Sequence, residues 1–375
     1  MLDNSKIEIL DTTLREGEQT PGVLFTLEQK LSIAKNLDSF GIDFIEIGHP
    51  AVSQDIYDAV EAINSLDLRA KKIAHGRALK SDINDAAAIG IDWIGIFFGT
   101  SPLSLKHKFN ITKKEALGRI ERAIKYGKDK GLKLRFTAED ASRTEIEFLI
   151  EIGKLAQQSG ADRFSLADTV GCLTPTKTKV LVKRIVSELD IPIHLHSHND
   201  FGMATANSLT GFEAGVQCVD VTVDGLGERC GLSPLAEVIA GLVNIYKINK
   251  DWDLTLIPKL SRLVRSFSNL DQKDNKPLVG KNAFTHKAGL HVKAITKDPR
   301  SYEAFAPELV NRKRKIIIDK FTGVAALDNK YQELGIFLSK IELKEVIKKI
   351  KSHTKKVSWS NDELIYLIKS MGIKA

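Results

Sequence analysis

Apolar, β-branched runs recur along the first two thirds of the chain and alternate with amphipathic helical patterns. Between the first two runs, Thr26 and Gln29 have the spacing of a helix capping box, just ahead of an apolar stripe that starts at Leu27. About eight strand–helix units of this kind predict an α/β fold, a parallel (β/α)8 TIM barrel. The runs are Ile7–Leu10, Phe44–Gly48, Lys72–Gly76, Trp93–Gly99, Lys133–Glu139, Arg163–Asp168, Ile193–His198 and Val219–Gly227.

Polar side chains able to do chemistry stand at the ends of these apolar runs. Asp11–Gln19 follow the first run, Glu139 ends the fifth, Thr169 follows the sixth, and His198 ends the seventh. The carboxyl ends of barrel strands form one rim, so we expect these side chains to converge on a single mouth. A doubly wound open sheet is the alternative, but no glycine fingerprint of the dinucleotide type follows the first strand.

The strand–helix pattern fades after about Ile257, which Pro258 follows. The next distinctive stretch, Leu278–Pro299, is rich in glycine, lysine and histidine and reads as a loop-rich connector. From about Ser301 helical periodicity returns together with basic runs. We therefore predict a catalytic barrel over 1–258, a linker subdomain over 259–305, and a small helical C-terminal domain over 306–375.

Composition narrows the class of protein. With 43% hydrophobic residues, the 375-residue chain can bury a substantial core, and neither a signal sequence nor a run of ~18 apolar residues is present. We therefore expect a cytoplasmic protein that does not bind membranes. The net charge of +7 suits an anionic partner such as a nucleotide cofactor or nucleic acid. Nucleic-acid binding is disfavoured because aromatic residues make up only 7% of the chain and the specific motifs sit at strand ends.

The seventh run, "IHLHSHND", places His194, His196 and His198 on one face of a strand. Two imidazoles at i and i+2 can bind one divalent ion, and Glu16 in "DTTLREGEQ" offers a carboxylate beside the permanent cation Arg15. Such a set leaves coordination positions open, as a catalytic metal requires. It accepts magnesium, manganese, cobalt or zinc. A purely structural role is the alternative, above all for His194, which we expect to lie deeper, hydrogen-bonded within the barrel.

Six motifs in order resemble one enzyme family. They are "DTTLREGEQTPG", "RFTAEDASRT", "ADTVGCLTP", "HSHNDFGMATAN", "GLGERCGLSPL" and "FTHKAGLHVKAI". Together they resemble the homocitrate synthase and 2-isopropylmalate synthase family, the acyl-CoA-dependent condensing members of the DRE-TIM metallolyase superfamily. The resemblance implies a barrel, a linker subdomain and a helical domain. It also implies a homodimer in which the connector of one subunit covers the other's barrel mouth.

Functional residues carry over from the resemblance motif by motif. It implies that Glu16, His196 and His198 bind the metal, and that Gln19 positions the substrate. Arg15 would neutralise charge on the 2-oxoacid or the developing enolate. The implied acid–base residues are Glu139, His291 and Tyr302. The implied reaction is a Claisen condensation of acetyl-CoA, the co-substrate, with a 2-oxoacid, followed by thioester hydrolysis and release of CoA.

The choice of 2-oxoacid depends on whether the pocket accepts a second carboxylate. In the homocitrate synthase branch a histidine, an arginine and a hydroxyl residue hold the distal carboxylate of 2-oxoglutarate, and this chain has His75, Arg135 and Thr137 there. Thr169 resembles the threonine that binds the C1 carboxylate. These residues predict homocitrate as the product, serving lysine biosynthesis through 2-aminoadipate or the supply of nitrogenase cofactor.

Other acceptors stay open as alternatives. "EIGHPAVS" at Glu46–Ser53 resembles the 2-isopropylmalate synthases or the homocitrate synthases of nitrogen fixation, and Leu232 departs from many relatives. 2-Oxoisovalerate, pyruvate or oxaloacetate could therefore replace 2-oxoglutarate. A lyase of the same superfamily that cleaves an acyl-CoA is a further alternative, and the "FTHKAGLHVKAI" connector argues against it.

Overall fold

Eight parallel strands close into a barrel at the centre of the chain's larger unit. This computed structural model describes residues 7–373. Each strand pairs with the next, and β1 closes the barrel on β8 with Ile9 opposite Val219. The strands are β1 (Glu8–Asp11), β2 (Phe44–Gly48), β3 (Lys71–Arg77), β4 (Trp93–Gly99), β5 (Lys133–Glu139), β6 (Arg163–Asp168), β7 (Ile193–Ser197) and β8 (Cys218–Val221). The predicted TIM barrel is confirmed.

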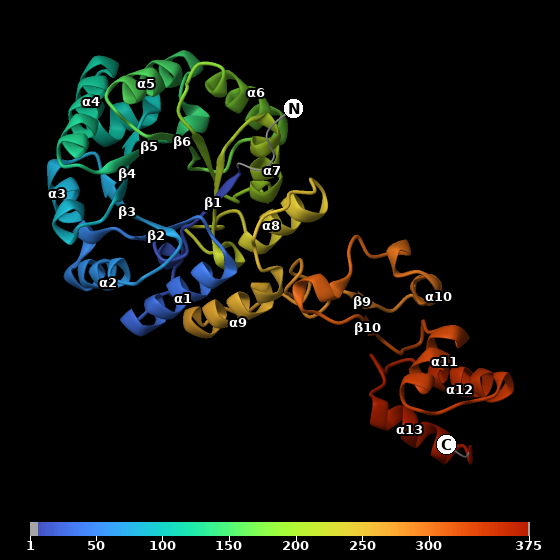
Figure 1. Cartoon of the computed structure of the whole chain (residues 1–375). Helices are drawn as coiled ribbons and strands as arrows, with labels where there is room; N and C mark the ends of the chain where they lie inside the picture. Colours follow the sequence, from blue (N-terminus) through green and yellow to red (C-terminus); the bar gives the residue numbers. More distant parts are fainter. Residues whose placement is uncertain (1–6, 374–375) are drawn as a thin grey trace. The chain divides into compact units, whose positions relative to one another are not determined.

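A ring of helices surrounds the strands (Figure 1). The predicted capping box is present: the Thr26 side chain accepts from the Gln29 N–H, and the Gln29 side chain accepts from the Thr26 N–H. The first helix ends at Gly41, whose φ of 98° and close approach to the Asp251 carbonyl exclude a side chain. The helices are α1 (Leu27–Phe40), α2 (Gln54–Asn64), α3 (Lys80–Ile89), α4 (Lys113–Asp129), α5 (Ile146–Gln158), α6 (Pro175–Val186), α7 (Ala204–Ala214), α8 (Leu235–Asn244) and α9 (Ile257–Ser268).

Short helical turns follow several strands and shape the rim of the barrel. One is a π-helical segment, η4 (Ser104–Phe109), between β4 and α4. The others are the 3-10 turns η2 (Gly17–Gln19), η3 (Pro50–Val52), η5 (Ala141–Arg143) and η6 (Val223–Gly225), whereas a further 3-10 turn, η7 (Leu254–Leu256), leads from α8 into α9. The eighth strand is therefore shorter than the predicted Val219–Gly227 run. It gives way to η6, where Asp224 and Gly225 take positive φ values of 57° and 73° that no strand accommodates.

An apolar cluster lies in the barrel interior near the start of the strands, and charged side chains gather near their ends. Phe44, Trp93 and Cys218 are the first residues of β2, β4 and β8, and they pack in one buried cluster with Leu10 and Ile73. Toward the other end, charged side chains replace them. Side-chain alternation along each strand thus supplies a hydrophobic floor beneath a polar mouth.

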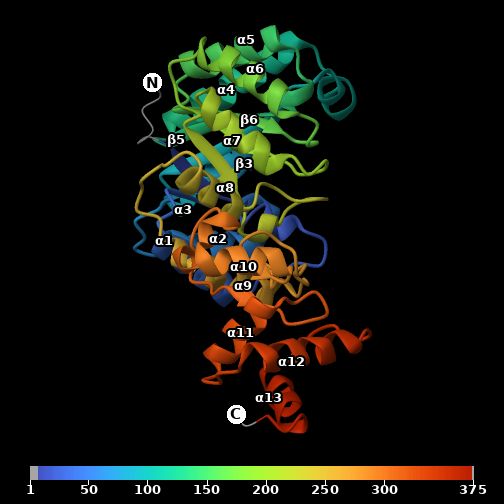
Figure 2. The same cartoon turned by 90° about the vertical axis from the view of Figure 1, so that its right-hand side faces the viewer.

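The second compact unit covers 272–375, and the barrel unit covers 1–271. It contains a two-stranded parallel sheet formed by β9 (Thr285–His286) and β10 (Lys315–Ile316). Three helices, α11 (Val324–Glu333), α12 (Lys340–Ser352) and α13 (Asn361–Ser370), share a core around Tyr331, and Figure 2 shows them from a second side. The remaining elements are α10 (Gly289–Lys297), η8 (Pro299–Ser301) and η9 (Pro307–Val310). Within residues 7–373, no helix combines the length and apolar character needed to cross a bilayer.

Candidate active site

The carboxyl ends of the barrel strands enclose a cavity of about 210 Å³. Ten of the twelve site residues predicted from the sequence line it: Arg15, Glu16, Gln19, His75, Arg135, Thr137, Glu139, Thr169, His196 and His198. Phe97, Ala167, Asp220, Glu228 and Arg229 complete the lining. The prediction that polar strand ends converge on one mouth is therefore confirmed.

Glu16, His196 and His198 form a buried cluster with the composition of a metal site. Their ligand atoms all lie within 4.8 Å of one another. His196 stands on β7, whereas His198 lies just beyond that strand and forms an isolated bridge with Leu232. Glu16 follows β1 and accepts from the Glu228 N–H at 3.1 Å, which fixes one carboxylate oxygen at the rim.

The hydrogen bonds around the two histidines leave nitrogen lone pairs for an ion. Nδ1 of His196 lies 3.1 Å from Asp220 Oδ2, an acceptor, so this nitrogen carries the proton and Nε2 keeps its lone pair. Nδ1 of His198 is buried and has no hydrogen-bond partner within residues 7–373. A carboxylate and two imidazoles, one with an unsatisfied buried nitrogen, fit a divalent cation.

Ionisation states agree with this fit. Burial and the neighbouring His196 lower the pKa of His198 to about 4, which keeps the imidazole in its metal-binding neutral form. Burial opposes ionisation of Glu16, but the charge of Arg15 and the adjacent imidazoles prevail and lower its pKa to about 2. At neutral pH the cluster therefore offers an anionic carboxylate at Glu16 and a neutral imidazole at His198.

A buried carboxylate, Glu46 on β2, organises the cations beside this cluster. Its Oε2 accepts from Arg15 Nε at 2.6 Å and from the Thr12 hydroxyl at 2.6 Å. Its Oε1 accepts from Arg135 Nη2 at 2.7 Å. Burial opposes its ionisation, yet the charges of Arg15 and Arg135 and the hydrogen bond to His75 hold the pKa of Glu46 well below its usual range. Glu46 therefore fixes the orientation of two arginines.

Arg135 is held on both sides. Besides its bond to Glu46, its Nη1 donates to Asp220 Oδ2 at 3.2 Å, and the side chain is almost fully buried. Gly95 on the neighbouring β4 makes room for it, because a Cβ there would lie 3.0 Å from Arg135 Nη2. Arg135 thus borders the cavity as part of a buried ion network, and its predicted contact with substrate stays a prediction.

His75 and its surroundings form one wall of the cavity. Its Nδ1 lies 3.1 Å from Glu46 Oε1, and its ring stacks on Phe97 with centroids 4.9 Å apart. Burial, then the charge of Arg15, lowers the pKa of His75 to about 4. His49, to which the sequence motifs assign no role, meets the His75 ring edge-on at 5.6 Å and bonds through Nε2 to Asp82 Oδ2 at 2.9 Å.

Three further predicted residues have distinct partners at the rim. Both oxygens of Glu139 accept from Lys108 Nζ, at 2.9 and 2.8 Å. The Thr169 hydroxyl accepts from the Asp140 N–H at 2.9 Å. The buried Thr137 hydroxyl has no hydrogen-bond partner within residues 7–373, so it can still bond to a ligand.

His291 and Tyr302 belong to the second unit. Their rings stack with centroids 3.9 Å apart, so the two predicted acid–base residues lie together. His194, in contrast, is fully buried between Asp220 and Arg163, with Nδ1 3.4 Å from Asp220 Oδ1 and Nε2 3.1 Å from Arg163 Nη1. The expectation that His194 lies deeper and is hydrogen-bonded is confirmed.

Sequence reasoning missed Glu46 and Asp220. Each is a single carboxylate inside an apolar strand, "FIEIG" and "CVDV", and each is buried at the centre of the ion network. The signal was present, because an isolated charge in a buried strand requires a partner. Only the closed barrel shows that these partners are the cations of other strands.

Comparison with known proteins gives two consecutive family matches. Residues 6–264 match the HMGL-like family, and residues 278–358 match the family described as homocitrate synthase post-HMGL domain-like. The homocitrate synthase of Sulfurisphaera tokodaii is 43% identical over 376 residues, covering 98% of this chain and 80% of that protein. The homocitrate synthase of Saccharolobus islandicus is 45% identical over 359 residues, covering 93% and 77% respectively.

Solved structures resemble the chain in fold. The hydroxymethylglutaryl-CoA lyase of Pseudomonas aeruginosa has a TM-score of 0.64 at 19% identity, covering 71% of this chain and 94% of that one. The HMG-CoA lyase of Brucella melitensis has the same score and identity, covering 71% and 100%. The barrel is therefore shared with lyases, whereas the high identity and the second domain are shared with synthases. With its buried Glu16, His196 and His198 cluster and both matching domains, this chain belongs to the homocitrate synthase family within the HMGL-like enzymes.

Proposed function

We propose that this chain condenses acetyl-CoA with 2-oxoglutarate and hydrolyses the thioester to give homocitrate and CoA. The observation that carries the proposal is the cavity in which the Glu16, His196 and His198 cluster stands beside His75 and two arginines. A 2-oxoacid needs a chelating ion at one end, and a dicarboxylic one also needs donors for its second carboxylate. The relatives named homocitrate synthase support the same acceptor.

Glu16, His196 and His198 would hold the divalent ion, magnesium, manganese, cobalt or zinc, which when bound polarises the ketone of the 2-oxoacid. Asp220 supports this set by fixing the tautomer of His196. Arg15 borders the same cavity and contributes a permanent positive charge where an enolate or alkoxide oxygen develops. Thr169 and Thr137 supply hydroxyl groups for the substrate's carboxylates.

The condensation requires a base for the acetyl methyl group. Glu139, which lines the cavity and is paired with Lys108, is the candidate on the barrel. The base takes one methyl proton, the resulting carbon attacks the ketone carbon, and the new alkoxide receives a proton. Water then attacks the thioester and CoA leaves as the thiol. We assign the remaining proton transfers to His291 and Tyr302, which stack on one another.

We also propose a homodimer in which the second unit of one subunit serves the barrel of the other, and lysine biosynthesis as the use of the product. Several large apolar side chains of the second unit are exposed, including Leu290 and Phe337, each at 80%. Such surfaces on a folded unit favour burial against a partner. Sedimentation analysis of the full chain tests this proposal, because a monomer at micromolar concentration would exclude it.

The acceptor is tested by following thiol release from acetyl-CoA with a divalent ion and 2-oxoglutarate, 2-oxoisovalerate, pyruvate or oxaloacetate. Turnover chiefly with 2-oxoglutarate, with homocitrate identified by mass, is the expected result. A preference for a monocarboxylic oxoacid would keep the condensing chemistry and replace the acceptor. Release of acetoacetate or another fragment from a larger acyl-CoA, without condensation, would point to a lyase instead.

A further inference from the structure

The first histidine of "IHLHSH", His194, has no role in the proposed reaction, yet it lies within a series of buried hydrogen bonds. It stands on β7, opposite Cys218 at the start of β8. His196 and Asp220 come two residues further along the same strands, so their side chains lie one layer closer to the rim. The connected side chains run from the floor of the barrel toward the candidate metal ligands. We name them the floor network: Glu8, Arg163, His194 and Asp220.

Two contacts determine which nitrogen of His194 carries its proton. Nε2 lies 3.1 Å from Arg163 Nη1, and Nδ1 lies 3.4 Å from Asp220 Oδ1. A guanidinium group can only donate, so Nε2 must accept and therefore holds a lone pair. An ionised carboxylate can only accept, so Nδ1 must donate. The two contacts together allow one state of His194, a neutral ring with its proton on Nδ1.

Arg163 is itself held in a fixed position. Its Nη2 lies 2.5 Å from Glu8 Oε2, and the residue is 8% exposed. The central carbon of its guanidinium group lies 4.7 Å from the centroid of the Phe44 ring and 5.5 Å from that of Trp93. A cation enclosed by aromatic rings and paired with a carboxylate has few alternative positions. Arg163 is therefore a fixed donor on the floor side of His194.

Asp220 connects His194 to the metal ligand His196. Its Oδ1 accepts from His194 Nδ1, whereas its Oδ2 accepts from His196 Nδ1 at 3.1 Å and from Arg135 Nη1 at 3.2 Å. A carboxylate with donors on both oxygens cannot rotate without losing a buried hydrogen bond. His196 therefore meets a fixed acceptor at Nδ1, which leaves the lone pair of its Nε2 for an ion.

We propose that Arg163 and His194 are positioning residues that set the tautomer of His196 by acting through Asp220. Without the Arg163 donor, His194 can carry its proton on Nε2 instead, and its Nδ1 lone pair then faces the Asp220 carboxylate. Repulsion between the lone pair and the carboxylate turns Asp220 away from His196. The inference rests on the proposed function only for the role of His196 as a metal ligand. The tautomer itself is a property of the protein without ion or substrate.

The floor network also excludes a second ion beneath the first. His194, Cys218 and Asp220 offer ligand atoms that lie within 4.8 Å of one another, as a metal site requires. Both nitrogens of His194 are engaged, however, so its ring has no lone pair to give. Burial raises the pKa of the Cys218 thiol well above its usual range, which keeps the sulfur protonated. We therefore expect the barrel unit to bind one divalent ion.

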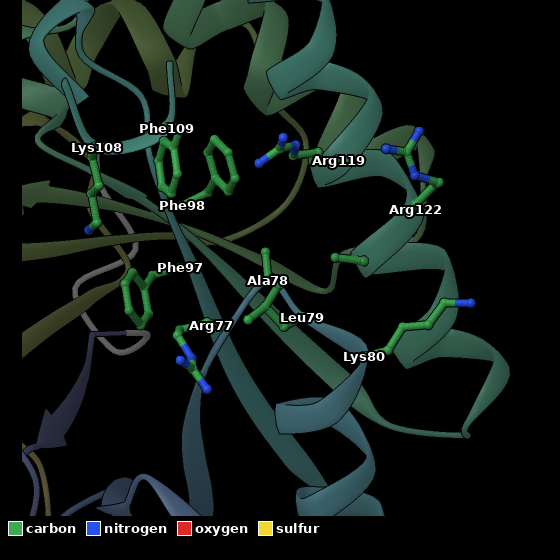
Figure 3. A pocket seen from close by; sticks show the side chains of 11 residues that line it. Arg77, Ala78, Leu79, Lys80, Phe97, Phe98, Lys108, Phe109, Arg119 and Arg122 are labelled. Atoms are coloured by element: carbon green, nitrogen blue, oxygen red, sulfur yellow. The ribbon is translucent and has the colours of Figure 1, made fainter. Parts of the chain in front are cut away.

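The test measures the tautomer of His196 in the metal-free full chain labelled with 15N-histidine. Ring-nitrogen chemical shifts in NMR distinguish an N–H from a lone pair, and the His196 signal is the one lost in His196→Gln. We expect the wild type to carry the proton on Nδ1, and Arg163→Met and His194→Leu to show a mixture of tautomers. Arg163→Lys keeps a donor and a charge and should restore the Nδ1 proton. The control is Arg119→Met, which removes an exposed arginine that borders a separate cavity and points toward Phe98 (Figure 3).

Calorimetric titration of the same proteins with Mn²⁺ gives the second measurement. We expect Arg163→Met and His194→Leu to bind the ion about tenfold more weakly, as the loss of support for a metal-binding histidine implies. Arg163→Lys and Arg119→Met should bind it as the wild type does, with one ion per chain. Neither measurement requires turnover, so both results stand even if the chain does not make homocitrate.

Two results would overturn the inference. One is a wild-type His196 with its proton on Nε2, which needs no variant to observe. The other is a pair of variants, Arg163→Met and His194→Leu, that lose stability in urea but keep the wild-type tautomer and Mn²⁺ affinity, because a purely structural floor network predicts that combination. Two ions per chain would contradict the exclusion of the site at Cys218.

Discussion

At the scale of single residues, the site depends on two buried carboxylates, Glu46 and Asp220, that hold its cations in place. Glu46 accepts from Arg15, Arg135 and Thr12 and lies beside His75, and it has no exposed surface. Asp220 similarly joins Arg135 to His196. Because a buried charge is stable only with its partners, these two carboxylates fix the positions of the cations that line the cavity.

Arg135 is the residue at which this network can be tested. Replacing it with Met leaves both Glu46 and Asp220 short of a buried partner, and loss of one member of a buried pair costs about 3–5 kcal/mol. We expect Arg135→Met to lower the free energy of unfolding by that amount in urea titration. Arg69→Met is the control, since that side chain is 76% exposed and its ion pair is 3.9 Å long. Normal stability with only a raised KM for 2-oxoglutarate would instead make Arg135 a dedicated substrate ligand.

His75 gives a prediction about protons. Its pKa of about 4 makes it neutral at pH 7, and Glu46 holds the Nδ1 proton, so Nε2 presents a lone pair. A substrate carboxylate at Nε2 requires the protonated ring, so binding must raise the pKa of His75 and take up a proton. We expect 2-oxoglutarate to bind with uptake of up to one proton at pH 7. Its affinity should then fall as pH rises through the pKa of the bound state.

Calorimetry in buffers of different ionisation enthalpy measures this uptake directly. The slope of binding enthalpy against buffer enthalpy gives the number of protons, and the titration should be done with the divalent ion already saturating. His75→Gln should bring the slope close to zero. A slope of zero in the wild type would show that the second carboxylate is held elsewhere.

The positions of the motifs along the strands determine how much of the site can be predicted from the sequence. Residues such as Glu16, His198 and Thr169 directly follow strands, so the rule that strand ends share a rim brought them to one cavity. The prediction that Arg135 and Thr137 share one face of β5 is also confirmed, because both side chains line the cavity. Glu46 was beyond this reasoning, because its partners come from three other strands and only barrel closure brings them together.

At the scale of elements, α3 is locked to the barrel rim by one aspartate. Asp82 accepts from the backbone N–H and the guanidinium of Arg77 on β3, and from the Ser81 hydroxyl. It also bonds to His49, which follows β2. Three consecutive segments of the rim thus meet at one buried carboxylate, which explains why His49 stands next to His75 without a catalytic assignment.

Asp82→Asn should loosen this corner. The asparagine amide cannot accept all of these hydrogen bonds. A well-shielded hydrogen bond to a charged group contributes about 1.5–3 kcal/mol. Because Arg77 is half exposed, we expect the free energy of unfolding to fall in total by an amount near that of one such bond. Urea unfolding measures the change, with Asp85→Asn on the same helix as the control. Equal stability of the two variants would show that the corner is held by helix packing alone.

At the scale of the whole molecule, the chain consists of two compact units, and the boundary lies between 271 and 272. Helix α9 belongs to the barrel unit, which therefore extends past the predicted limit of 258 because a ninth amphipathic helix packs on α1. The apolar periodicity of α9 could not show whether this helix belongs to the barrel unit or to the second unit, because an amphipathic helix can pack on either. The closed barrel places α9 in the first unit, because α9 packs its apolar face on α1.

The division into two units predicts that metal binding and turnover can be separated. All three metal-ligating candidates and their supporting Asp220 lie in the barrel unit, whereas His291 and Tyr302 lie in the second. We expect a fragment of residues 1–271 to fold and to bind a divalent ion in calorimetry with the affinity of the full chain. The same fragment should release no CoA from acetyl-CoA and 2-oxoglutarate.

Adding the fragment 272–375 in trans should restore part of the thiol release, because its helices share a core of their own around Tyr331. The matched control is the same fragment carrying His291→Ala, which keeps that core and should restore nothing. If the barrel fragment alone turned over substrate at the rate of the full chain, the proton transfers would have to be carried by Glu139 and the barrel rim, and the assignment of His291 and Tyr302 would fail.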